Sequence, residues 1–501
     1  MQTYYYNLSG GINQASTKTE LGLDTKNIYW TDSKNVEILQ NRGIIKQKGN
    51  TNILTLQSEE EVSAMHELKY SSRRRLIIIT KNGSIYIYNL ENDTLVLLET
   101  TISHTKITFT DYLNGTLIAS DSNKLLFLKN DENFTITDCN LKDSNNAYVY
   151  TNIIAVYKGR IWAAKDSTLY FSALGKFDDF QTADDAGYIS NFYTDADEIL
   201  ALKPYKDYLA IYKEKSVYLL SGSNPDDFSI IPFADRGTFS SECVVNVNNK
   251  QYFMTDGIYP LEVGTLNQIM IGDDITRKIK SEFDKFDKSR LNEVFALHYE
   301  LKNQVWYFIP YLKDDYFHTI WINDYVNKAW FKRVVPQNIT TACIYDNKIF
   351  TADCNGKIYI EDYGTTFDGE AIDFMWKSPF LSLGNPSVRK SIDEFYFILD
   401  ESYENNFTFS VYKNFDSENR DDVEQVYSTN FNNLHWSDDY KNLNDVWDSD
   451  ENTSLWAVSA DTMYKAEISE ANYAVQLCVE GNELGSSAAI IGIEFKEIYT
   501  E

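Results

Sequence analysis

The chain has 501 residues, and its 36 tyrosines, 28 phenylalanines and 9 tryptophans, set against only 8 prolines, favour strands over helices. It has 46 lysines and arginines against 74 aspartates and glutamates, a formal net charge of −28, which argues against tight, charge-driven binding to nucleic acid or to an anionic membrane. The length exceeds what a single core usually needs and predicts two or three domains.

Residues 1–60 form an N-terminal segment in which glycine turns and short strands precede any regular repeat. Its first residues lack the basic stretch followed by an apolar one that marks a signal peptide. No apolar run in the chain approaches the roughly 20 residues of a membrane-spanning helix. We therefore expect a protein that is made in the cytoplasm and is not inserted into a membrane.

Residues 61–380 repeat one pattern, which is clearest at 161–172, where two short apolar runs flank a polar turn. Such an order predicts a strand, a turn and a second strand. The first turns of the successive units lie at Ser72, Gly115, Gly159, Asp207, Asn249, Asn303 and Asn347. The second turns, 8 to 11 residues later, lie at Gly83, Asn123, Ser167, Lys215, Gly257, Asp314 and Gly356.

The first turns recur every 42 to 54 residues, and units of three or four short strands at this spacing are typical of β-propeller blades. A four-stranded blade cannot bury both of its faces alone, so we expect the blades to stack around an axis. The pattern gives six or seven blades, because the first and last units can merge, and residues 50–57 are placed to add the strand that closes the ring. A generic all-β chain with evenly spaced turns is the alternative interpretation.

One stretch inside the repeats has helical spacing instead. Between Asp273 and Phe286, apolar residues recur at Ile275, Ile279, Phe283 and Phe286, which lie on one face of a helix. We expect a single inserted helix that packs on the rim of the propeller and accounts for the longest interval between turns. A helix that binds a partner is the alternative.

Residues 381–501 change to longer strands at wider intervals, which predict an additional C-terminal antiparallel β-sandwich domain. The candidate strands span 390–399, 406–412, 473–478 and 488–495. Between them, residues 431–456 are rich in Asp, Asn and Trp and predict an extended arm. Its Trp436, Trp447 and Trp456 are candidates to anchor a protein interface, and capping of the sandwich core is the alternative.

The residue types that usually carry catalysis, or bind metals and cofactors, form no recognisable pattern. The five cysteines contain no Cys-x-x-Cys pair and the five histidines no His-x-x-x-His pair, which gives no support to a disulfide framework or a zinc site. Neither a Gly-x-Ser-x-Gly elbow nor a phosphate-binding loop occurs. We therefore expect no catalytic, metal or cofactor site. A glycosidase built from two of the many carboxylates is the alternative, although the repeated sequence box of sialidase-like propellers is missing.

Several short motifs remain, and they lie in the N-terminal and middle parts of the chain. The N-terminal ones are Gly10-Gly11-Ile12-Asn13, Asn35-Val36, Gly43-Ile-Ile-Lys46 and Lys48-Gly49. The later ones are residues 169–180, 237–243 and 255–260. Together these stretches resemble the β-propeller tail proteins of bacteriophages, in particular the tail nozzle or hub proteins of short-tailed phages.

The resemblance implies a structural protein of the virion tail, made in the host cytoplasm, with no enzymatic role. It implies a homo-oligomeric ring below the portal that retains the packaged genome and then forms a conduit for its ejection. The implied partners are other tail, portal or adaptor proteins, and double-stranded DNA that passes without tight binding. One propeller's own channel is too tight for a duplex, so the conduit would lie between subunits, and a negative lumen suits the sliding of DNA. A tail-tip propeller that binds a receptor or glycan through the three tryptophans is the alternative.

Overall fold

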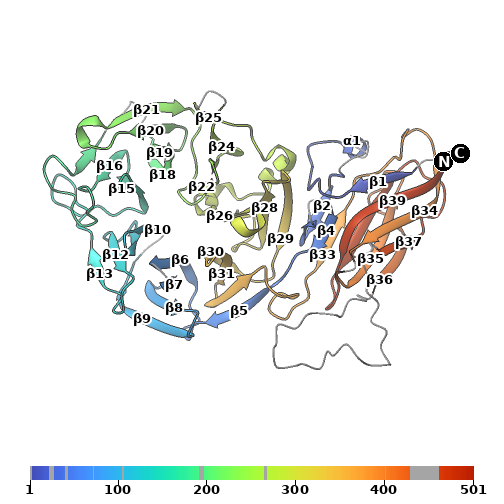
Figure 1. The fold of residues 1–501 in the computed structure, drawn as a ribbon, viewed down its shortest axis with the longest axis horizontal. Coiled ribbons are helices and arrows are strands. Elements are labelled where there is room, and N and C mark those ends of the chain that lie inside the picture. Colours follow the sequence, from blue (N-terminus) through green and yellow to red (C-terminus); the bar gives the residue numbers. More distant parts are fainter. Residues whose placement is uncertain are drawn as a thin grey trace, which may run out of the picture. The chain divides into compact units, whose positions relative to one another are not determined.

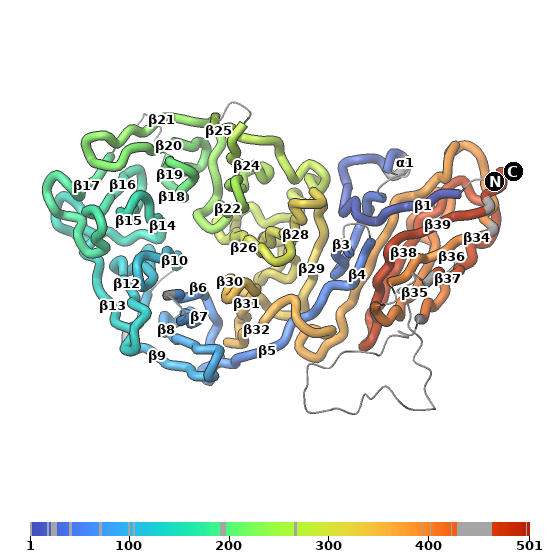
Figure 2. Tube along the Cα trace, in the orientation of Figure 1, coloured from blue at the N-terminus to red at the C-terminus, as the bar shows by residue number. Residues whose placement is uncertain are grey.

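The structure is a computed structural model that describes residues 3–21, 28–39, 43–70, 73–103, 106–190, 197–264, 268–400, 402–428 and 462–500. The expected all-β class is confirmed, because strands make up most of the regular structure and the helices are short (Figure 1). The chain divides into two compact units (Figure 2). Unit 1 comprises Met1–Gly49, Val326–Arg333 and Thr365–Glu501, and unit 2 comprises Asn50–Tyr325 and Val334–Gly364.

Seven small antiparallel sheets of four strands each lie among the described residues between Asn50 and Gly364. Sheet 1 contains β6 (Val62–Tyr70), β7 (Arg73–Thr80), β8 (Ser84–Asn89) and β9 (Thr94–Thr101). Sheet 2 contains β10 (Ile107–Tyr112), β11 (Gly115–Ser120), β12 (Leu126–Lys129) and β13 (Ile136–Asp138). Sheet 3 contains β14 (Ile153–Tyr157), β15 (Arg160–Lys165), β16 (Thr168–Phe171) and β17 (Gly187–Ile189).

Sheets 4 to 7 repeat the same order of strands. Sheet 4 contains β18 (Ile199–Tyr205), β19 (Tyr208–Lys213), β20 (Val217–Ser221) and β21 (Ser229–Ala234). Sheet 5 contains β22 (Val245–Val247), β23 (Lys250–Met254), β24 (Ile258–Val263) and β25 (Ile269–Ile271). Sheet 6 contains β26 (Phe295–Tyr299), β27 (Gln304–Phe308), β28 (Thr319–Asp324) and β29 (Ala329–Val334). Sheet 7 contains β30 (Ile339–Tyr345), β31 (Lys348–Asp353), β32 (Lys357–Glu361) and β5 (Asn50–Thr55).

The turns expected from the sequence fall between the strands of these sheets. The first turns join first and second strands and the second turns join second and third strands; only the Ser72 turn lies outside the described residues, between β6 and β7. The backbone is left-handed at several of them, including Lys158 (φ 47°), Gly159 (φ 74°) and Lys206 (φ 53°). Left-handed residues are what tight two-residue hairpins require.

The second strand of a sheet is buried on both faces, and β15 shows why. Its Ile161 and Ala163 pack into a core shared with sheet 2, whereas Trp162 and Ala164 pack into a core shared with sheet 4. Because side chains alternate along a strand, a run of consecutive apolar residues needs a neighbour on each side. Each sheet is therefore stable only between two others.

The seven sheets contact one another in series, and the seventh contacts the first. Shared apolar cores join sheets 1 to 5 in order, and contacts of β22 with β26 and of β26 with β30 continue the series. Met65 and Leu76 of sheet 1 lie in one cluster with Phe350 and Ile358 of sheet 7. In Figure 1 these sheets follow one another around a common centre. Such sheets are of the kind that form propeller blades.

The last of these sheets takes its fourth strand from the other end of the sequence. β5 pairs antiparallel with β32, so that Ile360 lies opposite Thr51 and Lys357 opposite Thr55. The side chains of Asn50 and Glu361, at the end of this pairing, are joined by a hydrogen bond of 3.0 Å. The pairing uses the residues to which the sequence analysis assigned ring closure.

Unit 1 contains two larger antiparallel sheets. The six-stranded sheet contains β1 (Tyr4–Asn7), β3 (Val36–Leu39), β4 (Gly43–Lys46), β39 (Ala489–Thr500), β34 (Lys390–Leu399) and β37 (Thr462–Ala466). The five-stranded sheet contains β2 (Asp32–Lys34), β33 (Phe374–Lys377), β38 (Val475–Gly481), β35 (Asn405–Lys413) and β36 (Arg420–Ser428). Phe395 and Phe397 of β34 lie against Phe409 of β35, with ring centroids 5.5 and 4.9 Å apart, so the sheets pack face to face.

The unit boundaries differ from those expected at residues 60 and 380. Strands β1 to β4 belong to the two sheets of unit 1, and Tyr6 of β1 pairs with Ile493 of β39. Four short strands cannot bury an apolar face without partners, and their partners lie more than 300 residues away in the sequence. Local sequence patterns carry no information about a pairing so distant.

The helix expected between Asp273 and Phe286 is a 3₁₀ segment, η2 (Arg277–Asp284), with non-helical angles at Ile279. Its buried residues are Thr276, Ile279 and Glu282, three apart, as the three-residue turn of a 3₁₀ helix requires. The expected α-helical stripe is therefore wrong in its period, although Ile279 is buried. The remaining described helices are α1 (Lys18–Leu21), η1 (Pro225–Asp227), η3 (Lys288–Glu293) and η4 (Glu300–Lys302).

The N-terminal glycine motif has a structural role within unit 1. Gly11 has φ 67°, and a Cβ added there would lie 2.7 Å from the Cβ of Ala329, so only glycine allows this approach. The N–H of Ile12 donates to the carbonyl of Trp330 over 2.8 Å. Further along, the buried guanidinium of Arg333 donates to the carbonyls of Lys48 and Gly49 at 2.7 and 2.9 Å. The motifs thus hold the segment Val326–Arg333.

Candidate functional site

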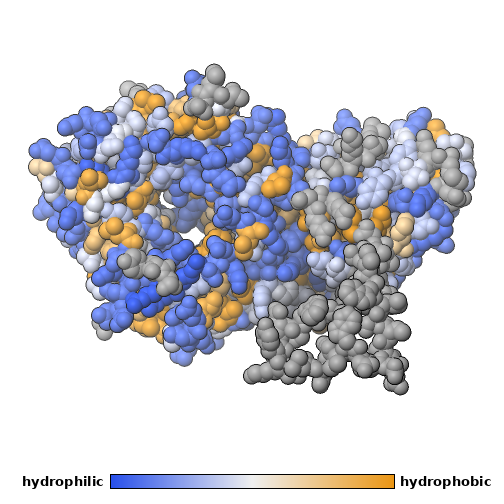
Figure 3. All heavy atoms as spheres, viewed as in Figure 1, coloured by the Kyte–Doolittle hydropathy of each residue, from blue (hydrophilic) through white to orange (hydrophobic). Residues whose placement is uncertain are grey.

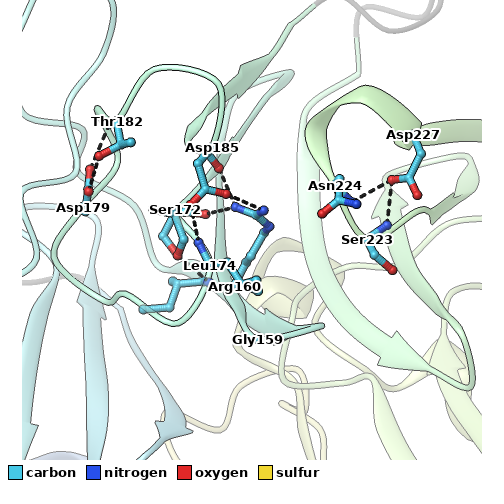
Figure 4. Close-up of polar contacts among 12 residues, drawn as sticks. Gly159, Arg160, Ser172, Leu174, Asp179, Thr182, Asp185, Ser223, Asn224 and Asp227 are labelled. Atoms are coloured by element: carbon cyan, nitrogen blue, oxygen red, sulfur yellow. Dashed lines mark hydrogen bonds and ion pairs between the residues drawn. The ribbon is translucent and has the colours of Figure 1, made fainter.

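The segment that resembles a phage-protein blade motif, residues 169–180, leads into a loop held by one buried arginine (Figure 4). The guanidinium of Arg160 donates to the carbonyl of Ser172 over 2.9 Å and to a carboxylate oxygen of Asp185 over 2.6 Å. The other carboxylate oxygen of Asp185 accepts from the N–H of Leu174 over 3.1 Å. Arg160 thereby joins the two ends of the loop 172–186.

These contacts also fix the ionisation of Asp185 and the aromatic side of the loop. The Arg160 guanidinium, and after it the N–H of Leu174, hold the pKa of the Asp185 carboxyl below its usual range. Phe177 stacks on Phe127 of β12, with ring centroids 4.3 Å apart, and Phe180 is buried in the core between sheets 2 and 3. The motif therefore works as a strap between neighbouring sheets, which is a structural role.

A second group of polar residues meets at the centre of the seven sheets. Lys106 directly precedes β10 of sheet 2, Glu242 precedes β22 of sheet 5, and Asn292 lies in η3, just before β26 of sheet 6. The Nζ of Lys106 lies 3.6 Å from a carboxylate oxygen of Glu242 and donates to the carbonyl of Asn292 over 2.7 Å. Sheets 2 and 5 are not neighbours in the series, so these contacts cross the centre.

We call Lys106, Lys203, Glu242 and Asn292 the axial cluster. Lys203 lies on β18, the first strand of sheet 4, and it interacts electrostatically with both Glu242 and Lys106. Burial lowers the pKa of the Lys203 ammonium below its usual value, and the nearby Glu242 carboxylate opposes this shift. The cluster brings two lysines and one glutamate from four sheets to one place.

A polar link between sheets 1 and 2 involves His66 of β6 and Asp111 of β10. The Nε2 of His66 lies 2.8 Å from a carboxylate oxygen of Asp111, and the ring stacks on Phe109 with centroids 4.9 Å apart. Burial raises the pKa of Asp111, but the hydrogen bonds from His66 and Thr116 outweigh burial and leave it lowered. The first strands are thus tied together by polar as well as apolar contacts.

A surface cleft in unit 2 lies over sheet 5 and carries charges of both signs. Arg236 pairs with Asp256 at 3.2 Å, Arg277 pairs with Asp273 at 3.1 Å, and Lys280 lies 3.5 Å from Asp274. The cleft is also lined by Ala234, Asp235, Tyr259, Ile271 and Gly272. Because its charged side chains neutralise one another, the cleft presents no unpaired charge to a ligand.

The surface of unit 2 is otherwise largely hydrophilic on the face seen in Figure 3, where hydrophobic residues form small separate patches. Within the described residues, no group of three or more His, Cys, Asp or Glu side chains is arranged to hold a metal ion. In that same part of the chain, no helix is long and apolar enough to cross a membrane.

The residues singled out from the sequence and the residues that meet in the structure are different sets. Trp436, Trp447 and Trp456 lie outside the described residues, so their role as an interface stays a prediction. Sequence reasoning missed the axial cluster, because its members are 36 to 186 positions apart and form no motif. A signal was present in Lys203, a charged residue inside the apolar run of a first strand.

Comparisons with known proteins give no family. No family model matches the chain, and no curated protein matches it. Among solved structures, a crystal structure of the computationally designed Ika8 protein matches with 12% sequence identity and a TM-score of 0.38, covering 72% of this chain and 99% of that chain. At this TM-score the likeness supports no argument about function.

Replacing Arg160 with Met keeps most of the buried volume but removes the donors to Ser172 and Asp185. We expect the free energy of unfolding to fall by about 3 kcal/mol, because buried acceptors lose a charged donor. Urea unfolding measures this loss, and faster hydrogen exchange in the loop 172–186 locates it. The exposed Arg236→Met variant is the control, and an equal loss in both variants would contradict the structural role of Arg160.

Replacing Lys106 with Met removes both contacts that cross the centre. Since the pair is partly exposed, we expect the free energy of unfolding to fall by no more than about 1 kcal/mol. Hydrogen exchange should become faster near Asn292. Lys81→Met, which removes the pairing of Lys81 with Glu61 at 2.8 Å, serves as the control. Unchanged exchange near Asn292 in the Lys106 variant would show that this link does not join the sheets.

Proposed function

We propose that this protein is a structural component of a bacteriophage tail, a nozzle or hub ring below the portal that retains the genome and forms a conduit for its ejection. The proposal includes the finer architecture: the seven sheets form a closed seven-bladed β-propeller, accompanied by the sandwich of unit 1. Its main support is the series of contacts that returns from sheet 7 to sheet 1, together with the pairing of β5 with β32. A rigid scaffold of this kind suits a building block.

The position of the conduit follows from the axial cluster. The side chains of Lys106 and Glu242 span the centre of the seven sheets, so no duplex can thread this space. DNA must then pass outside the propeller, through a lumen enclosed by several copies of the chain. Closed rings of identical subunits need a head-to-tail interface, in which two different surfaces of the chain meet. The partners are then further copies of this chain and the adjoining tail, portal or adaptor proteins.

The charge of the chain suits this task. At a net charge of −28 the subunits repel DNA phosphates, so a lumen lined by them offers little affinity for a passing duplex. Charged side chains in the cleft of sheet 5 are paired, and the motifs that resemble the phage family hold loops and strands in place. These observations favour assembly over catalysis, and they place the protein in the virion tail.

The full-length protein should form a cyclic oligomer, seen by native mass spectrometry and by cryo-electron microscopy, and peptides from it should be found in purified virions. It should not retard double-stranded DNA at physiological salt. A protein that stays monomeric at every concentration and is missing from virions would overturn the proposal. Binding of the isolated protein to host cells, abolished by replacing Trp436, Trp447 and Trp456, would favour the receptor-binding alternative instead.

A further inference from the structure

Lys203 is set apart from the other buried lysines by what its ammonium contacts. Burial lowers the pKa of Lys46 and Lys390 as well. Each of those two donates to backbone carbonyls, Lys46 to Ser486 over 2.5 Å and Lys390 to Val388 over 2.9 Å. Lys203 makes no hydrogen bond and no ion pair anywhere in the described part of the chain. An ammonium taken from water without an acceptor is costly.

The charges around Lys203 do not compensate it. Glu242 is the one carboxylate of the axial cluster, and its oxygen lies 3.6 Å from the Nζ of Lys106. Two ammonium groups thus share one carboxylate, which leaves one positive charge in excess at the centre of the sheets. Cys243 is the remaining titratable group that interacts with Lys203. This local excess stands in a chain whose net charge is −28.

We propose that the axial cluster binds one small oxyanion, which accepts hydrogen bonds from the ammonium groups of Lys203 and Lys106. Bonds between an ammonium and an anionic oxygen are short and strong, and an anion at this place would supply the acceptor that Lys203 lacks. Lysine presents a point charge and does not select one geometry, so phosphate and sulfate both fit this chemistry. The site is independent of the assembly proposed above, because it lies within a single chain.

The site also explains why a charged residue is placed on a strand that is otherwise apolar. Leu202, the residue before Lys203, is buried in the core shared by sheets 3 and 4. Side chains alternate along a strand, so Lys203 faces away from this core. A methionine at position 203 would fill similar space without charge. An ammonium here is therefore expected to serve an anion.

The test compares three forms of the full-length protein: wild type, Lys203→Met and Lys206→Met. Lys206 is an exposed lysine at the end of the same strand, bonded to Asn249 over 2.9 Å, and is the matched control. Inorganic phosphate, and sulfate in a second arm, are titrated at constant ionic strength. Binding is measured by calorimetry and by the thermal unfolding midpoint, which rises when a ligand binds only the folded state.

We expect phosphate to bind with one-to-one stoichiometry and to raise the unfolding midpoint of wild type and Lys206→Met. In Lys203→Met the affinity should fall at least tenfold, while the midpoint without phosphate should be unchanged or higher, since an uncompensated charge has gone. Absence of binding to wild type, or equal binding to Lys203→Met, would overturn the proposal.

Two further measurements keep the test decisive if Lys203→Met does not fold. Glu242→Gln removes the carboxylate that competes for both lysines, so phosphate should bind more tightly to this variant. In wild type, affinity should fall as the pH rises through the lowered pKa of Lys203, because only the ammonium form donates to an anion with charge assistance. Weaker binding to Glu242→Gln together with pH-independent binding in wild type would equally contradict the site.

Discussion

The burial of the second strand of each sheet on both of its faces is the constraint on which the rest of this structure depends. In β15 four consecutive residues, Ile161 to Ala164, are fully buried, and they point alternately into cores shared with sheet 2 and with sheet 4. A sheet of this composition cannot end a stack, because its outer face would expose Val, Ile, Leu or Trp to water. Only a series that returns on itself gives every sheet two neighbours.

A series of sheets that returns on itself brings the first strands together at its centre. That centre is narrow, and the side chains reaching it come from sheets that are far apart in sequence. Lys106, Glu242 and Asn292 meet there across the ring, and Lys203 joins them without an acceptor of its own. The axial cluster is thus a consequence of the same packing that buries Trp162, and it carries both proposals about this chain.

The motifs that suggested a phage tail protein all have visible structural tasks. Gly11 allows a close approach to Ala329, Gly49 faces Thr366 with no room for a Cβ, and Phe177 and Phe180 strap sheet 3 to sheet 2. Such residues are restricted by geometry and not by chemistry. A sequence signature made of them describes how a scaffold is built, which suits a structural protein and leaves its partners to be found on its surfaces.

The sequence by itself determined the all-β class, the spacing of the turns and the position of the strand that completes sheet 7, because hairpins and alternating strands are encoded within about ten residues. It did not determine that β1 to β4 join sheets of unit 1, or that residues 277–284 adopt a 3₁₀ helix, because distant partners decide both. The axial cluster was also decided by tertiary structure alone. Its residues share no local pattern, and only the closing of the sheets on themselves brings four distant positions within reach of one another.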